Sequence, residues 1–340
     1  MENATHNTSY DVTIGATDTQ LVVIKTCTVT IAILGTFGNT IMISAILYGK
    51  LYKFSIYVKI LNLLVCNLIH CAIFLPLIAI QAFTGRLITE NIVCSLISYG
   101  LFCNLGTELF GYVCISFNRY ACIINQKLYN KLYGSPYLLI IEWIISWSIY
   151  PVILAFPLFG IFSHYEYAPM KLVCHPFLGV DCTGYCLFVF LFAILTTVPV
   201  IGFCYLQIIL VYVKLQRKIA SSRDNSKNST GSGSQTSIER KSGHGSKYMT
   251  HRKKAEIKMA FIILAIILFF GMCRLPFITL YIYDPSMVKV DPLIHTLVIY
   301  IGSNLNWINP IIYALTNTQI RHSLQSMVIA WKRKIFPPKF

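Results

Sequence analysis

Long apolar stretches alternate with short polar segments along the whole chain. Seven of them are long enough to cross a bilayer as a helix, which takes about 20 residues. They cover residues 21–47, 57–83, 92–122, 136–160, 183–214, 256–283 and 291–315. Polar residues such as Lys59 and Glu108 interrupt the second and third stretches, and polar groups within such spans usually face the interior of a bundle. The pattern predicts an all-α membrane protein, a seven-transmembrane helix bundle.

Composition favours a membrane-embedded chain over a water-soluble one. Of the 340 residues, 56% are hydrophobic and 12% are charged, which leaves too little polar surface to cover a soluble domain of this size. The net charge of +15 lies beside the spans, because 23 of the 28 basic residues fall in segments that are cytoplasmic if the N-terminus is outside. Positively charged loops stay on the cytoplasmic side. The charge therefore indicates orientation, and we predict no nucleic-acid partner.

The predicted organisation is one transmembrane domain, residues 21–315, between two short ends. Residues 1–20 are polar and lack the pattern of a cleavable signal peptide. We expect them to be extracellular and glycosylated at Asn3 and Asn7, which begin Asn-X-Thr/Ser sequons. Residues 316–340 place apolar residues at helical spacing among basic ones. They predict a short amphipathic helix on the inner membrane surface, attracted to anionic lipid, and a C-terminal tail.

Residues 220–251, between the fifth and sixth spans, are rich in Ser, Gly and Lys and almost free of large apolar residues. A segment of this composition cannot bury a core, so we expect a disordered third cytoplasmic loop. Two interpretations stay open. The loop is either a target of kinases, and with them of arrestin, or a solvated linker.

Most of the twelve cysteines lie inside apolar spans, where a buried thiol behaves as a small hydrophobic group. Cys94 and Cys174 fall at the outer face, which is an oxidising environment. We predict a disulfide between them. Cys182 is a competing partner, because spacing alone does not fix connectivity.

Polar residues and prolines recur at particular positions in the spans. They are Gly38-Asn39, Asn67, Asn118-Arg119-Tyr120, Trp147 with Pro157, Cys273-Arg274-Leu275-Pro276 and Asn306-Trp-Ile-Asn309-Pro310-Ile-Ile-Tyr313. In this order they resemble the rhodopsin-like, class A, family of G protein-coupled receptors. Asn118 before Arg119, the run Leu128 to Tyr133 and the run Phe203-Cys-Tyr-Leu206 resemble the melatonin-receptor-like branch and receptors of the moody and trapped-in-endoderm type.

The resemblance implies a plasma-membrane receptor that binds an extracellular ligand and activates a heterotrimeric G protein through an inner switch. Arg119 needs a partner at the membrane boundary, and Glu256 is the candidate; the alternative is that Glu256 is solvated among neighbouring basic residues. Asn118 replaces the usual aspartate and weakens one restraint on Arg119. The remaining predicted members of the coupling switch are Tyr120, Tyr205, Asn309, Pro310 and Tyr313.

Two opposite charges are predicted near mid-membrane. Glu108 is eleven residues outward from Arg119, roughly 16 Å at 1.5 Å per residue, and Arg274 is nine residues from Tyr283, roughly 14 Å. An isolated charge at this depth is costly, so we expect a Glu108–Arg274 salt bridge in place of the sodium ion that many family members bind. The rest of the intramembrane polar core is Asn39, Asn67 and Asn306.

Two alternatives remain for this pair: Glu108 binds sodium with Asn67 and Asn306, or Arg274 points outward and binds an acidic ligand. The resemblance places Leu101 where amine receptors carry aspartate, which disfavours an aminergic ligand. A mostly apolar cavity favours a lipid-like or small hydrophobic ligand. The residues expected to line it are Leu101, Asn104, Leu105, Arg274, Phe277, Tyr281, His295, Ile299 and Ser303.

Three other functions compete with a signalling receptor. A receptor-like scaffold without signalling tolerates Asn118, Arg274 and Lys127 at switch or coupling positions. A transporter could use intramembrane Glu and Arg, but the sequence has no internal repeat or matching pair of broken spans. An enzyme is not expected, because neither a cluster of metal ligands nor a cofactor motif is present in the sequence.

Overall fold

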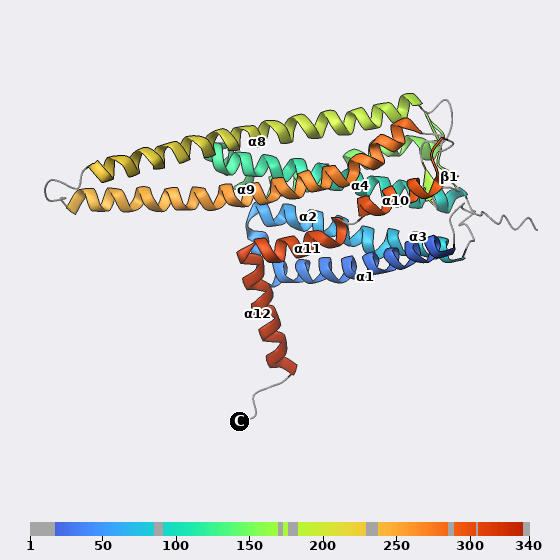
Figure 1. The fold of residues 1–340 in the computed structure, drawn as a ribbon, viewed down its shortest axis with the longest axis horizontal. Helices are drawn as coiled ribbons and strands as arrows, with labels where there is room; N and C mark the ends of the chain where they lie inside the picture. Colours follow the sequence, from blue (N-terminus) through green and yellow to red (C-terminus); the bar gives the residue numbers. More distant parts are fainter. Residues whose placement is uncertain are drawn as a thin grey trace, which may run out of the picture.

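A computed structural model describes residues 18–84, 91–168, 173–175, 183–228, 237–284, 289–303 and 305–335. Six helical stretches in this part of the chain are long and apolar enough to span a membrane, from Lys25–Tyr48 to Lys253–Leu280. The seventh predicted span is formed by α10, Pro292–Ser303, and α11, Leu305–Thr316. All seven predicted spans are therefore helical, and Figure 1 shows them running side by side.

The first, third, fifth and sixth spans are single helices, whereas the second and fourth are interrupted. The single helices are α1 (Asp18–Tyr48), α4 (Asn91–Ile124), α8 (Thr183–Asn228) and α9 (Ser237–Tyr283). The second span comprises α2 (Ser55–Ile69), a π-helical turn (His70–Phe74) and α3 (Leu75–Thr84). The fourth comprises α6 (Pro136–Ser146), α7 (Ile149–Leu154) and a 3₁₀ turn (Phe156–Phe159).

Shorter elements connect and cap the spans. A 3₁₀ turn (Leu51–Lys53) joins α1 to α2, and α5 (Gln126–Tyr133) follows the third span. At the other end of the bundle, β1 (Glu166–Ala168) pairs antiparallel with β2 (Val173–His175). The apolar pattern did not predict this hairpin, because three-residue strands carry too little alternation to be recognised.

Side chains are distributed as expected for a protein surrounded by lipid. Large apolar residues face outward, such as Phe37 on α1 and Leu195 on α8, with more than 60% of each side chain exposed. Polar residues lie inside: Asn39, Asn67 and Asn309 are fully buried. Lipid cannot hydrogen-bond to polar groups, so they gather in the interior of the bundle, away from lipid.

The third span, α4, is the helix around which the others pack. It contacts α2, α7, α8 and α9, and its side chains Tyr112 and Ile115 lie at the centre of the largest buried apolar cluster. A close approach at Gly106 lets the ring of Tyr150 from α7 lie directly against the α4 backbone. In the second span, the π-helical turn brings Cys71 against Gly35 of α1 in the same way.

The outer hairpin covers the end of α4. Strand β2 packs against this helix, and the backbone of Cys174 lies opposite Tyr167 in the pair. Cys94 is disulfide-bonded, but the side chain of Cys174 and the whole of Cys182 lie outside the described residues, so the predicted connectivity stays a prediction. Asn3 and Asn7 also lie outside the described residues.

After the seventh span the chain turns into α12 (Thr318–Ile335), which leaves the bundle sideways in Figure 1. Ile320 is buried against the core, and the Ser323 hydroxyl donates to the carbonyl of Ala45 in α1 at 2.5 Å. Val328 and Trp331 stay exposed. The predicted amphipathic helix is therefore present, anchored at its first turns and with apolar side chains available to lipid beyond them.

The described parts of residues 220–251 are helical, which differs from the predicted disorder. Helix α8 continues to Asn228 and α9 begins at Ser237, and Figure 1 shows both extending past the inner ends of their neighbours. Extending an existing helix avoids the cost of nucleation. Composition did not predict that the two spans continue into this segment.

Replacing Gly106 by Ala is expected to destabilise the protein, because the added Cβ collides with the ring of Tyr150. Overpacking of this kind costs about 1–3 kcal/mol. The matched control is Gly202→Ala on α8, where nothing lies within 4 Å of an added Cβ. Thermal unfolding of purified protein in detergent checks the prediction, and equal midpoints for the two variants would contradict it.

Candidate functional site

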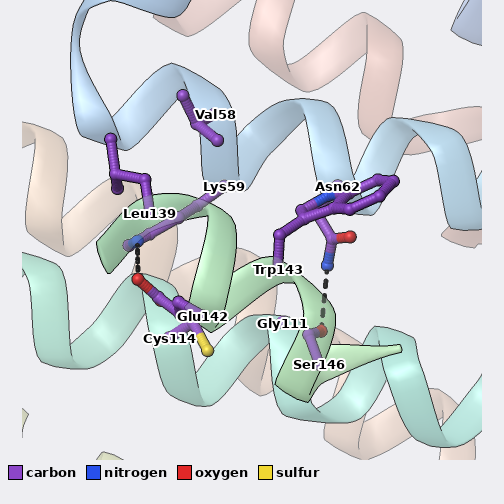
Figure 2. A pocket seen from close by; sticks show the side chains of 9 residues that line it. All are labelled: Val58, Lys59, Asn62, Gly111, Cys114, Leu139, Glu142, Trp143 and Ser146. Atoms are coloured by element: carbon purple, nitrogen blue, oxygen red, sulfur yellow. Dashed lines mark hydrogen bonds and ion pairs between the residues drawn. The ribbon is translucent and has the colours of Figure 1, made fainter. Parts of the chain in front are cut away.

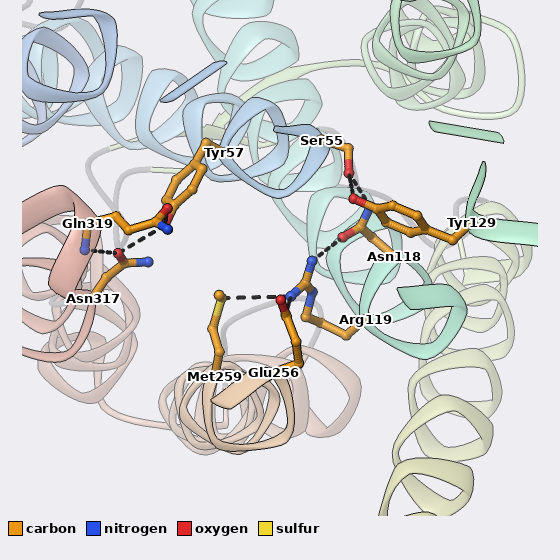
Figure 3. Close-up of polar contacts among 9 residues, drawn as sticks. All are labelled: Ser55, Tyr57, Asn118, Arg119, Tyr129, Glu256, Met259, Asn317 and Gln319. Atoms are coloured by element: carbon orange, nitrogen blue, oxygen red, sulfur yellow. Dashed lines mark hydrogen bonds and ion pairs between the residues drawn. The ribbon is translucent and has the colours of Figure 1, made fainter. Parts of the chain in front are cut away.

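The inner end of α4 carries a buried arginine that is paired across the bundle. The Arg119 side chain is 2% exposed, and its Nη1 lies 2.7 Å from Oε2 of Glu256 on α9. The same Nη1 is 3.8 Å from the sulfur of Met259. Figure 3 shows the guanidinium between α4 and α9. The predicted Arg119–Glu256 ion pair is therefore present and joins α4 to α9 at one end of the bundle.

Asn118 holds the arginine from the other side without a charge. Its Oδ1 accepts a hydrogen bond from Nη2 of Arg119 at 2.7 Å, and its Nδ2 donates to the hydroxyl of Ser55 at 2.8 Å. The Ser55 hydroxyl is also 3.0 Å from that of Tyr129 on α5 (Figure 3). The second inner loop is thus joined to the arginine through a chain of hydrogen bonds.

Among the predicted switch residues that the structure describes, no hydrogen bond joins Tyr205 to Asn309 or Tyr313. Tyr205 and Tyr313 are buried in the same apolar cluster, but the Tyr205 hydroxyl and both amide atoms of Asn309 have no hydrogen-bond partner among the described residues. Apolar packing against residues such as Ile208 holds Tyr205 instead. Tyr120 packs its ring against Phe203 of α8, with centroids 5.5 Å apart.

A second ion pair joins α4 to α9 near mid-membrane, as predicted. Nη2 of Arg274 lies 3.6 Å from Oε2 of Glu108, and both side chains are largely buried. The Tyr112 hydroxyl is 3.5 Å from Oε1 of the same carboxylate. The guanidinium carbon lies 5.3 Å from the centroid of Phe270, and Gly302 of α10 leaves room for it. The long N–O separation means that the pair is not a close bidentate contact.

Several buried amides around this level have no protein partner. Both side-chain amide atoms of Asn67 and Asn306 lack a hydrogen bond in the described structure, as do Nε and Nη2 of Arg274. Asn39 is partly satisfied, because its Nδ2 donates to the carbonyls of Gly35 and Asn306 at 2.7 and 2.8 Å. Buried polar groups of this kind are normally satisfied by ordered water. The cluster is therefore a polar interior that connects the first, second, sixth and seventh spans.

Two predicted pocket residues make contacts inside the protein. Nδ2 of Asn104 donates to the carbonyl of Cys66 at 3.1 Å, although its Oδ1 has no hydrogen-bond partner among the described residues. His295 was predicted to line the cavity, but it is buried, with Nε2 3.1 Å from Oδ2 of Asp284. That carboxylate also accepts hydrogen bonds from the backbone N–H groups of Lys289 and Val290. Asp284, at the end of α9, is thus joined both to the residues just before α10 and to His295 within it.

The remaining predicted pocket residues stay a prediction. Leu101, Leu105 and Phe277 are partly exposed, and Phe277 also packs against the buried cluster around Cys103 and Tyr150. The side chains of Tyr281, Ile299 and Ser303 lie outside the described residues.

Sequence reasoning missed one buried charge pair. Nζ of Lys59 on α2 lies 2.6 Å from Oε2 of Glu142 on α6, beside a crevice between the second, third and fourth spans (Figure 2). Lys59 had been recognised only as a polar interruption. The available signal was depth: the two opposite charges lie four residues from the start of α2 and six from the start of α6.

Comparison with known proteins agrees with the motifs. Residues 38–313 match the family model described as 7 transmembrane receptor (rhodopsin family). The chain is similar to the G-protein coupled receptor moody of Drosophila melanogaster, with 24% identity over 91% of this chain, and to protein trapped in endoderm-1 of the same species, with 23% identity over 89%. It spans about half the length of moody (51%) and 77% of trapped in endoderm-1.

A shorter alignment joins the chain to melatonin receptor type 1B of Rattus norvegicus, 23% identical over 55% of this chain and 50% of that receptor. The fold is similar to that of squid rhodopsin, with a TM-score of 0.75 at 18% identity, covering 95% of this chain and 89% of the other. The resemblance to these receptors that the motifs predicted is confirmed. The chain belongs to the rhodopsin family of seven-transmembrane receptors.

Proposed function

We propose that this receptor lies in the plasma membrane with its N-terminus outside and activates a heterotrimeric G protein when the inner ends of α4 and α9 separate. The Arg119–Glu256 pair carries the proposal, because it closes the cytoplasmic end between these two helices. A buried charge that loses its partner is strongly destabilised. A bound G protein that offers Arg119 new hydrogen-bond acceptors can replace Glu256 and hold the open form.

The resting state is less firmly closed than it would be if both partners of Arg119 were acidic. Asn118 accepts from the Arg119 guanidinium with an uncharged amide oxygen, so this bond lacks the attraction between two opposite charges that an aspartate in its place would add. Glu256 is also 28% exposed and so partly screened. The proposal therefore includes signalling in the absence of ligand.

The proposed ligand is a small apolar or lipid-like molecule. An acidic group on this ligand would find a cationic partner in Arg274. Leu101 offers no charge for an amine, whereas Nε and Nη2 of Arg274 are donors that no described residue accepts from by a hydrogen bond. An acidic group that reached Arg274 would compete with Glu108, which is 3.6 Å from the guanidinium. Such competition would loosen one of the two ties between α4 and α9.

Other partners follow from the cytoplasmic side. The apolar and basic residues of α12 suit the surface of an anionic bilayer, and the third inner loop, residues 220–251, offers serines beside basic residues to kinases and so to arrestin. No nucleic acid, cofactor or enzymatic step is part of this proposal.

One observation favours a receptor-like scaffold that does not signal. The resemblance predicts an apolar residue eight positions after Arg119, where it would insert into the G protein. Here that residue is Lys127, which is exposed, and its neighbour Leu128 is partly buried. If the loop is shifted by one residue, Leu128 takes the apolar position and coupling to the G protein is kept. If it is not shifted, Lys127 takes that position and coupling is weakened.

Replacing Glu256 by Gln is expected to raise ligand-independent G protein activation several-fold, because Arg119 loses its charged partner. Nucleotide exchange in membranes, at matched surface levels, checks this. Arg119→Ala should abolish activation, and Lys254→Gln, an exposed neighbour on α9, should leave it unchanged. Silence of every variant at normal surface levels would favour the scaffold.

Exchanging the two mid-membrane charges tests the Glu108–Arg274 pair. Removing one partner of a buried pair costs about 3–5 kcal/mol, so Glu108→Arg and Arg274→Glu should each lower surface expression and the unfolding temperature. The double variant should recover a large part of both. If it is no better than the single variants, the pair does not hold the helices together.

Sodium is expected to have no specific effect on the wild-type receptor, because the guanidinium of Arg274 already neutralises Glu108. Unfolding temperatures in sodium chloride and in choline chloride at equal ionic strength should agree. A higher temperature in sodium alone, lost in Glu108→Gln, would mean that the carboxylate binds the cation instead.

A further inference from the structure

The Lys59–Glu142 pair is placed where it can position the second inner loop. Nζ of Lys59 lies 2.6 Å from Glu142 on α6 and also 4.5 Å from the ring centroid of Tyr133, the last residue of α5. One ammonium group therefore contacts two successive elements. The Lys59 side chain is 5% exposed and that of Glu142 is 25% exposed, so water has little access to the lysine.

Depth makes this contact strong. Lys59 is four residues beyond Ser55, roughly 6 Å along α2, and Glu142 is six residues beyond Pro136, roughly 9 Å along α6. Both charges thus lie within the inner part of their spans. Separating them there would leave each charge without a substitute partner.

Few other contacts attach the inner half of α6 to the bundle. Its side chains Tyr137, Ile140 and Ile144 are all more than half exposed, as expected for a helix facing lipid. Asn62 adds two polar ties at the opposite end of α6: its Oδ1 accepts from Nε1 of Trp147 at 2.6 Å, and its Nδ2 lies 3.4 Å from the Ser146 hydroxyl. Figure 2 shows the ion pair and the Asn62–Ser146 bond along the same crevice.

The position of α6 is transmitted directly to α5. Only Gly134 and Ser135 separate the two helices, and the Tyr133 ring rests against Lys59. Burial raises the pKa of the Tyr133 hydroxyl well above its ordinary value, so the ring that meets the ammonium is neutral. Tyr133 also packs on Tyr129, with ring centroids 5.3 Å apart.

Tyr129 completes the connection to the switch. Its hydroxyl is 3.0 Å from that of Ser55, which accepts from Asn118, the neighbour of Arg119. The described contacts thus run without a gap from Glu142, on the side of α6 that faces α2, to the buried arginine at the end of α4. The exposed face of α5, including Lys127 and Lys131, is held in place by this chain of contacts.

We propose that Lys59 and Glu142 are a positioning pair that holds α5 in the orientation needed to engage the G protein. The inference rests on the proposed function, since it assigns α5 to the coupling surface. Neutralising either residue leaves the Arg119–Glu256 pair intact and lets the inner end of α6, and α5 with it, move. The pair therefore sets how efficiently an open receptor couples, and not whether it opens.

The experiment uses the Glu256→Gln background, in which the switch is released. Lys59→Met and Glu142→Gln are each expected to lower nucleotide exchange at least threefold at matched surface levels. Lys59→Arg should retain exchange, because it keeps the charge. Lys53→Met, an exposed lysine just before α2, should change nothing.

A second readout does not depend on coupling. Spin labels at Lys131→Cys on α5 and His322→Cys on α12, both exposed positions, report the distance between these helices. Each single neutralisation should broaden or shift the distance distribution, and the exchange Lys59→Glu with Glu142→Lys should narrow it again. Unchanged distances in both neutralised variants would overturn the proposal.

The two readouts separate the two ways of failing. If Glu256→Gln is silent while the distances respond as expected, the G protein function fails and the positioning of α5 stands. If Glu256→Gln signals and neutralisation changes neither exchange nor distance, the positioning role fails alone. If the single variants do not reach the surface, recovery of expression by the charge exchange supports the pair, and no recovery overturns it.

Discussion

A charge inside a bilayer has no water to solvate it, and the rest of this structure depends on that constraint. Every ionised side chain placed within the spans must find a partner on another helix, so each pairing also decides which helices are neighbours. Arg119 with Glu256 and Glu108 with Arg274 both join α4 to α9, at two different depths. A movement of α9 relative to α4 at one depth therefore changes the separation of the paired charges at the other depth.

The same constraint explains how much could be predicted from the sequence. Hydrophobicity located the spans, and the rise of 1.5 Å per residue placed Glu108 and Arg274 at similar depths, so their pairing could be expected. Arg119 and Glu256 followed from the same reasoning at the inner boundary. In each case a charge of opposite sign lay at a similar depth on another span.

Other features depend on the rotation of a helix about its axis, which depth alone does not give. Glu142 could face lipid, the bundle interior or α2, and only the packing of α6 decides among these. His295 was expected beside the cavity because it lies near the outer end of its span, but the acceptors on Asp284 turn it inward. Tyr205 shares a cluster with Tyr313, yet no hydrogen bond joins them among the described residues, since burial of a ring does not direct its hydroxyl.

The π-helical turn at His70–Phe74 has a consequence for comparing this chain with relatives. A π-turn accommodates one residue more than the α-helix around it, and each residue rotates an α-helix by about 100°. Beyond this turn, the residues of α3 face directions that a continuous α-helix would assign to their neighbours. An alignment with relatives whose second span is regular therefore needs a one-residue gap here. Without it, substitutions in Leu75–Thr84 would be attributed to the wrong face of the helix.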